Sequence, residues 1–106
     1  MLRIYTVSLD VAHQAVRFIK TISTNDKNLA DQLRRAVTSV PLNLAEGSGS
    51  RGGNRRQRYL TALGSAREVV ACIEVGRAMG YVQDIDDTAI RGNLDQVIGT
   101  LVRICR

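Results

Sequence analysis

Apolar residues recur every three or four positions in four separate stretches of the chain, and this spacing is typical of amphipathic helices. In chain order the apolar positions are Val11, Ala15, Phe18 and Ile22; Leu29, Leu33, Val37, Val40 and Leu44; Tyr59, Leu63, Ala66, Val70 and Ile73; and Ile90, Leu94, Val97, Leu101 and Ile104. No stretch alternates with the two-residue period of a strand. We therefore predict an all-α protein with four helices, at about 8–23, 27–47, 54–79 and 85–104.

Polar residues at the edges of these stretches suit helix ends, where unpaired backbone groups need partners. Candidate N-terminal caps are Ser8, Asn28, Asn54 and Asp84, and Gly80 suits the C-terminal end of the third helix. Asn54 is followed three residues later by Gln57, the spacing of a capping box.

Pro41 lies inside the second predicted helix. A proline removes one helical hydrogen bond and crowds the preceding turn, at a cost of about 3 kcal/mol or more. One alternative is that the helix ends near Ser39. We favour a helix that is kinked at Pro41 because the apolar pattern keeps its phase through to Leu44.

Four amphipathic helices with short links predict an up-down-up-down four-helix bundle, with residues 1–106 forming a single domain. Ala89, Gly92 and Gly99 line a second face of the fourth helix. Each glycine costs about 1 kcal/mol relative to alanine in a helix, so another helix should lie very close to this face. That helix belongs either to this bundle or to another subunit.

Charge is sorted along the chain. Thirteen of the 15 cationic residues are arginines, and the window Arg34 to Arg67 holds seven of them against Glu46 alone. In an up-down-up-down bundle one end collects Arg3, Arg51, Arg55, Arg56, Arg58, Arg103 and Arg106. The opposite end gathers Asp26, Asp31, Asp84, Asp86 and Asp87. We therefore expect a molecule that is polarised from end to end.

The basic end is the candidate binding site. Its predicted nucleic-acid-binding residues are Arg51, Arg55, Arg56, Arg58, Arg103 and Arg106. Guanidinium groups match phosphate oxygens, and a helix N-terminus attracts anions. The chain has four aromatic residues and no tryptophan, so contact with RNA or DNA should depend on shape and charge and not on base stacking. The alternative is that these arginines are solvated or pair with carboxylates of a neighbouring subunit.

The sequence contains no set of residues typical of catalysis or metal binding. Residues 47–52 match G-x-G-x-x-G, but a helix is predicted before them where a dinucleotide site needs a strand. His13 is the only histidine, and Cys72 and Cys105 lack metal-ligand spacing. We expect no enzyme activity, no metal, no cofactor and no membrane span, and we interpret both cysteines as free buried thiols.

Polar residues also share faces within the second and third helices. Arg35, Ser39, Asn43 and Glu46 lie on one face, and Ser65, Glu68 and Cys72 lie on another. We predict an ion pair between Arg35 and Glu68 that joins these helices and fixes their register.

About a third of the chain also resembles a known family. The segments concerned are Arg34-Arg35-Ala36, Ser39-Val40-Pro41, Asn43-Leu44-Ala45-Glu46-Gly47, and Tyr59-Leu60 followed by Gly64-Ser65-Ala66-Arg67-Glu68. They resemble small bacterial proteins encoded in intervening sequences of 23S ribosomal RNA genes, which have more distant relatives among the accessory variability determinants of diversity-generating retroelements. The motif residues are Arg35, Ser39, Pro41, Asn43, Glu46, Gly47 and Glu68.

The resemblance implies a cytoplasmic, non-enzymatic four-helix bundle that forms a ring-shaped homopentamer. In the retroelement relatives it implies binding of a reverse transcriptase and of nucleic acid. We therefore predict an oligomeric helical bundle whose arginine-rich end binds the RNA or DNA backbone. The alternative is an assembly or adaptor protein with no role in nucleic-acid binding.

Overall fold

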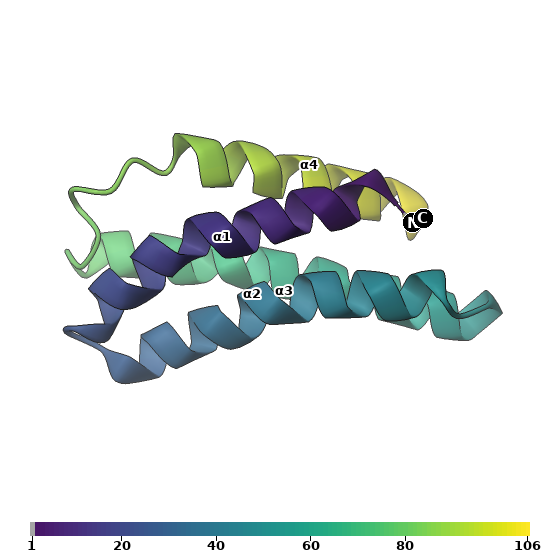
Figure 1. Cartoon of the computed structure of the whole chain (residues 1–106), viewed down its shortest axis with the longest axis horizontal. Helices are drawn as coiled ribbons and strands as arrows, with labels where there is room; N and C mark the ends of the chain where they lie inside the picture. Colours follow the sequence, from purple (N-terminus) through teal and green to yellow (C-terminus); the bar gives the residue numbers. More distant parts are fainter. Residues whose placement is uncertain (1) are drawn as a thin grey trace.

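The computed structural model describes residues 2–106, which form four helices and no strand. The helices are α1 (Arg3–Ser23), α2 (Lys27–Ser48), α3 (Gly52–Ala78) and α4 (Thr88–Ile104). They lie side by side in a rod of 42 × 24 × 20 Å (Figure 1). The predicted all-α four-helix bundle is confirmed.

Successive helices run in opposite directions along the rod (Figure 1). α1 packs against α2 and α4, and α3 packs against the same two helices. The start of α1 and the end of α4 lie at the end of the rod that also holds the α2–α3 connection, whereas the other two connections lie at the opposite end (Figure 1). This is the up-down-up-down arrangement, and it places the start of α3 near the end of α4.

The predicted apolar positions form the core, with one exception. Most are buried in one continuous cluster, and Val70 packs against it from the edge. Ile104 is wrong as a core position, because its side chain is 39% exposed at the end of α4 while Cys105 is buried. Val82 and Ile85, which precede α4, complete the core at the other end of the rod.

The start of α1 and the N-terminal cap of α2 differ from the prediction, whereas α2 itself begins at Lys27 as predicted. α1 begins at Arg3, so Ser8 is not a cap but lies inside the helix, where its buried hydroxyl donates to the Tyr5 carbonyl at 2.6 Å. The N-terminal cap of α2 is Asp26 and not Asn28, and its carboxylate accepts a hydrogen bond from the Leu29 N–H at 2.9 Å. α1 therefore gains residues 3–7, which the apolar pattern alone does not mark.

The starts of α3 and α4 also shift. α3 begins at Gly52, which has φ +57°, so Asn54 lies within the helix and does not cap it. α4 begins at Thr88 and not near residue 85. The carboxylate of Asp86, not of Asp84, accepts hydrogen bonds from the Thr88 N–H at 3.0 Å and from its hydroxyl at 2.7 Å.

Gly80 ends α3 as predicted. Its φ of +79° lies in the left-handed region that favours glycine. The Tyr81 N–H donates to the Gly76 carbonyl at 2.8 Å, and the Gly80 N–H donates to the Arg77 carbonyl at 3.0 Å. These two bonds form a Schellman motif, which satisfies carbonyls that a helix end otherwise leaves unpaired.

α2 continues through Pro41 without interruption. The alternative that this helix ends near Ser39 is therefore wrong. Pro41 is itself buried against the core, which is consistent with an apolar pattern that keeps its phase across it. The kink that a proline introduces in a helix stays a prediction here.

The α3–α4 connection is held by Arg77, a residue that the sequence pattern did not mark. Its guanidinium donates to the carbonyls of Val82 at 3.2 Å and Ile85 at 2.9 Å. It also lies 3.5 Å from Asp87, which accepts a 2.6 Å hydrogen bond from Arg91. These contacts fix the connection over the end of the core.

Acid should therefore weaken this end of the bundle. Hydrogen bonds from Thr88 lower the pKa of Asp86, and the hydrogen bond from Arg91 lowers the pKa of Asp87. A carboxyl whose pKa is lower in the folded state contributes stability above its unfolded pKa of about 3.9, and loses it as the pH falls through the folded value. The melting temperature followed by circular dichroism should fall between pH 5 and pH 3.

Asp86→Asn with Asp87→Asn provides the control for the acid prediction. Because the amides do not titrate, the double variant should lose less melting temperature over the same pH range than the parent protein. An equal loss in the two proteins would show that other carboxyl groups account for the acid sensitivity.

Candidate nucleic-acid interface

The basic end of the rod is built from the first turns of α3 and the last turn of α4. The left-handed Gly52 turns the chain sharply from α2 into α3, and residues 51–58, which include this turn, are all exposed. At α4, Arg103 and Arg106 are exposed beside the buried Cys105. The predicted arginines therefore lie at surface-accessible positions in or next to the ends of two antiparallel helices.

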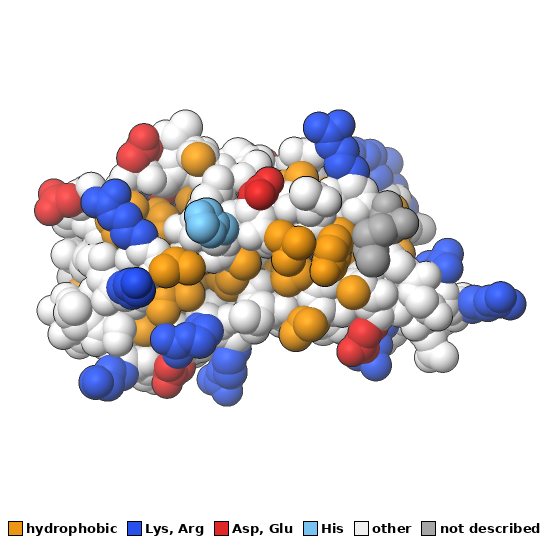
Figure 2. Space-filling view, in the orientation of Figure 1, with side chains coloured by type: hydrophobic (Ala, Val, Ile, Leu, Met, Phe, Trp, Pro, Cys, Tyr) orange, Lys and Arg blue, Asp and Glu red, His pale blue; other side chains and the backbone are white. Residues whose placement is uncertain are grey.

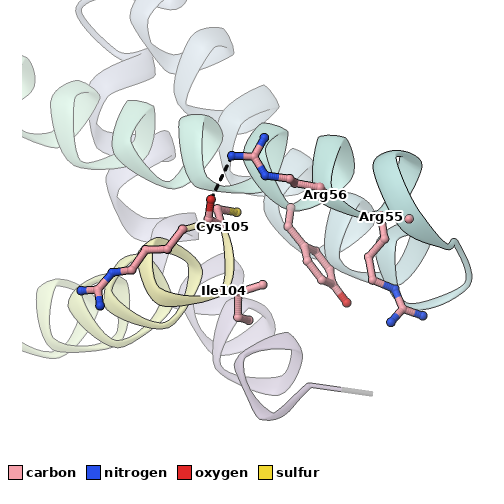
Figure 3. Close-up of a pocket in the computed structure, with 7 residues that line it drawn as sticks. Arg55, Arg56, Ile104 and Cys105 are labelled. Atoms are coloured by element: carbon pink, nitrogen blue, oxygen red, sulfur yellow. Dashed lines mark hydrogen bonds between the residues drawn. The ribbon is translucent and has the colours of Figure 1, made fainter.

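One hydrogen bond joins these two helix ends. The Arg56 guanidinium, in the first turns of α3, donates to the Cys105 carbonyl at 3.0 Å (Figure 3). The contact borders a shallow pocket of about 160 Å³ lined by Gly52, Arg55, Arg56, Tyr59, Ile104, Cys105 and Arg106. The predicted proximity of Arg55 and Arg56 to Arg106 is thus observed.

Arg55 lines the same pocket and also contacts the C-terminal end of α2. Its Nε donates to the carbonyls of Gly47 at 3.2 Å and Ser50 at 2.9 Å, so it also satisfies the C-terminal end of α2. The guanidinium groups of Arg55 and Arg56 point to different sides of the pocket (Figure 3). A guanidinium has five N–H donors, and each of these groups uses only part of that capacity in the bonds described.

Arg58 does not join the cluster. It forms an ion pair with Glu46 at 2.9 Å, and both side chains are about half exposed, at 50% and 56%. An exposed pair of this kind contributes about 0–1 kcal/mol, so it lends little stability but partly neutralises Arg58. Arg103 instead donates to the Thr100 hydroxyl at 3.4 Å, and Arg51 is an exposed residue at the start of α3.

The opposite end is less acidic than predicted. Asp31 pairs with Arg34 at 2.7 Å, and Asp87 contacts both Arg77 and Arg91. Figure 2 shows Lys and Arg side chains mixed with Asp and Glu toward this end on the visible face. The charge asymmetry therefore comes from the arginine-rich end and not from an equal acidic end.

The predicted ion pair between Arg35 and Glu68 is not formed. Both residues are exposed and neither takes part in a salt bridge within residues 2–106. The polar contact between α2 and α3 is made instead by two hydroxyls, because Ser65 donates to Ser39 at 2.7 Å. Asn43 supports this contact by donating to the Ser39 carbonyl and hydroxyl at 2.9 and 3.0 Å. The predicted faces meet, but through shorter side chains.

Gly47 has a packing role at the junction of α2 and α3. A β-carbon at this position would lie 2.7 Å from Cδ1 of Tyr59 and closer still to Cε1. The absence of a side chain therefore lets the Tyr59 ring lie directly on the α2 backbone, beside the arginine pocket that Tyr59 also lines.

Residues 2–106 contain no group of three His, Cys, Asp or Glu side chains that could hold a metal ion. Burial, with a smaller contribution from Glu68, raises the pKa of the Cys72 thiol, which disfavours the reactive thiolate. The glycine-rich segment 47–52 connects two helices, unlike the strand-to-helix turn of a dinucleotide site. None of the helices in residues 2–106 combines the length and apolar character needed to cross a bilayer.

The fold and this site define a small four-helix bundle with an arginine-rich end. The profile of the 23S rRNA-intervening sequence protein family matches residues 1–103, and the chain belongs to this family. Comparison with curated protein sequences gave no match.

A solved structure supports the fold. A protein of unknown function from the S23 ribosomal protein family of Bacteroides thetaiotaomicron, with a crystal structure at 1.70 Å resolution, superposes with a TM-score of 0.84. The two sequences are 20% identical, and the alignment covers 97% of this chain and 98% of the other. At this identity the likeness shows a shared bundle and no more.

Proposed function

We propose that the protein is a non-enzymatic, cytoplasmic homo-oligomer whose arginine-rich end binds the phosphate backbone of RNA or DNA. The observation that carries this proposal is the hydrogen bond from Arg56 to the Cys105 carbonyl. It joins the start of α3 to the end of α4 and so holds Arg55, Arg56 and Arg106 around one pocket.

Three physical features favour a phosphate ligand there. Arginine forks match phosphate oxygens, and the N–H groups at the start of α3 add a partial positive charge. Glu46, the acidic residue of this region, already forms an ion pair with Arg58. The pocket is too small for a typical drug-sized ligand, whose sites measure about 300–1,000 Å³, so a single phosphate group suits it better than a whole nucleotide.

Salt dependence provides the direct test. Binding of a labelled single-stranded RNA and of duplex DNA should be measured by fluorescence anisotropy between about 50 and 300 mM salt. Counterion release predicts that log K falls linearly with log salt, with a slope of about −0.7 for each phosphate contact on a single strand. Binding that does not respond to salt, or no binding at 50 mM, would contradict the proposal.

The alternative is an assembly or adaptor protein with no role in nucleic-acid binding. The contacts of Arg55 with the carbonyls of Gly47 and Ser50, and of Arg58 with Glu46, favour it, because both arginines then have structural partners. A protein partner would bind through side chains outside the pocket, and its binding should survive neutralisation of Arg56 and Arg106.

A further inference from the structure

α1 carries a second apolar stripe in addition to the one that faces the core. The stripe consists of Tyr5, Leu9, Ala12, Val16 and Ile19, at alternating spacings of four and three residues. Leu9 and Val16 are each 45% exposed, and the other three are half-buried. In Figure 2 hydrophobic side chains form a band along the visible face of the rod. A seam with this spacing suits packing against another helix.

The outer face of α4 has the matching pattern. Read backwards, Arg103, Gly99, Gln96, Gly92 and Ala89 also alternate by four and three residues. Within residues 2–106, and apart from the backbone of α4 itself and the neighbouring residues in the chain, nothing lies within 4 Å of a β-carbon built at Gly92, and only the Arg103 side chain lies within 4 Å at Gly99. The helix expected close to these glycines is therefore not part of this bundle.

The two stripes lie at the same heights along the rod. Gln14 of α1 and Asn93 of α4 are hydrogen-bonded at 3.1 Å and therefore lie level with each other. Antiparallel helices rise equally per residue, so Leu9 is level with residue 98 and Val16 with residue 91. Leu9 is therefore within one residue of the level of Gly99, and Val16 is within one residue of the level of Gly92.

We propose that the apolar stripe of α1 in one copy packs antiparallel against the outer face of α4 in the next copy. If copies are related by rotation about an axis parallel to the rod, heights are preserved, and the two exposed side chains of the stripe, Leu9 and Val16, meet Gly99 and Gly92 of α4. A second copy is the indicated occupant because both surfaces belong to this chain and match in spacing and in level.

This interface would be heterologous, since it joins two different surfaces. Repeated around an axis, such an interface closes into a ring. Every copy would then present its arginine-rich end on the same side of the ring. The inference rests on the proposed self-association and specifies the surfaces that produce it.

Leucine substitutions at the glycines test the interface. The substitutions Gly92→Leu and Gly99→Leu each add a side chain at a position that is open in the isolated protomer. In the proposed interface, α1 of the neighbouring copy must approach these positions. Self-association measured by analytical ultracentrifugation should weaken about tenfold or more in each. Gly64→Leu is the matched control, because Gly64 is an exposed helical glycine of α3 with nothing within 4 Å, and its assembly should stay unchanged. Melting curves should show that all three variants fold.

Cross-linking tests the register. In a Cys72→Ala, Cys105→Ala background, Leu9→Cys combined with Gly99→Cys should give a ladder of disulfide-linked copies on oxidation. Leu9→Cys combined with Gly92→Cys places the thiols two turns apart and should give none. An oligomer that is unaffected by Gly92→Leu and Gly99→Leu, and that gives no disulfide-linked ladder, would overturn this interface. The proposed self-association would then still stand. A parent protein that sediments as a monomer would overturn both.

Discussion

Replacing Arg55, Arg56 and Arg106 together by glutamine should weaken RNA binding about 100-fold at 100 mM salt. Each lost phosphate contact removes about 0.7 from the slope of log K against log salt for a single strand. The three substitutions should therefore flatten that slope by about two units. Fluorescence anisotropy with the same labelled RNA at several salt concentrations gives both quantities.

A charge-matched variant separates the pocket from net charge. Arg17→Gln, Lys20→Gln and Arg67→Gln remove the same number of cations from exposed positions outside the arginine pocket. Affinity should then fall less than about threefold. Equal losses in the two variants would show that binding follows the overall charge of +5 and not the arrangement at one end. Because Arg56 also bonds to Cys105, melting curves must accompany the first variant.

Gly47→Ala should destabilise the bundle by about 1–2 kcal/mol. The added methyl group overlaps the Tyr59 ring, and overpacking of this kind costs about 1–3 kcal/mol. Alanine recovers up to about 1 kcal/mol through its higher helix propensity. Urea unfolding followed by circular dichroism measures the net change.

A double-mutant cycle identifies the contact responsible. Tyr59→Leu removes the ring edge that meets the new methyl group, so Gly47→Ala should cost little or be stabilising in that background. If Gly47→Ala destabilises the Tyr59→Leu protein as much as the parent, the contact with Tyr59 is not the reason for glycine at this position.

The centres and C-terminal ends of the helices were predictable from sequence, but the starts of α1, α3 and α4 were not. Burial on one face imposes the 3.6-residue period, and Leu33, Val37 and Leu44 are buried as that period requires. The start of a helix depends on which polar side chain reaches a free N–H. Asp26 and Asp86 do so, while Asn28 and Asp84, two residues away in each case, suited the motif equally well.

The candidate site shows the same division. The up-down-up-down topology alone predicted that Arg55 and Arg56 meet Arg106. The start of α3 and the end of α4 lie at the same end of the rod in this topology. The topology did not predict which arginine pairs with a carboxylate. Arg35 and Glu68 lie on helices that do touch, yet the pair that forms is Ser39 with Ser65. Side-chain length and the distance between the helices decide such partners, and the periodic pattern of apolar residues specifies neither.

The position of Tyr59 has a practical consequence for spectroscopy. The chain has no tryptophan and three tyrosines, so its ultraviolet emission is phenolic. With Tyr5→Phe and Tyr81→Phe, the remaining phenol would be Tyr59, which is buried against Gly47 and borders the pocket that holds Arg55 and Arg56. Its quantum yield would then report, without any attached dye, on whatever occupies that end of the molecule.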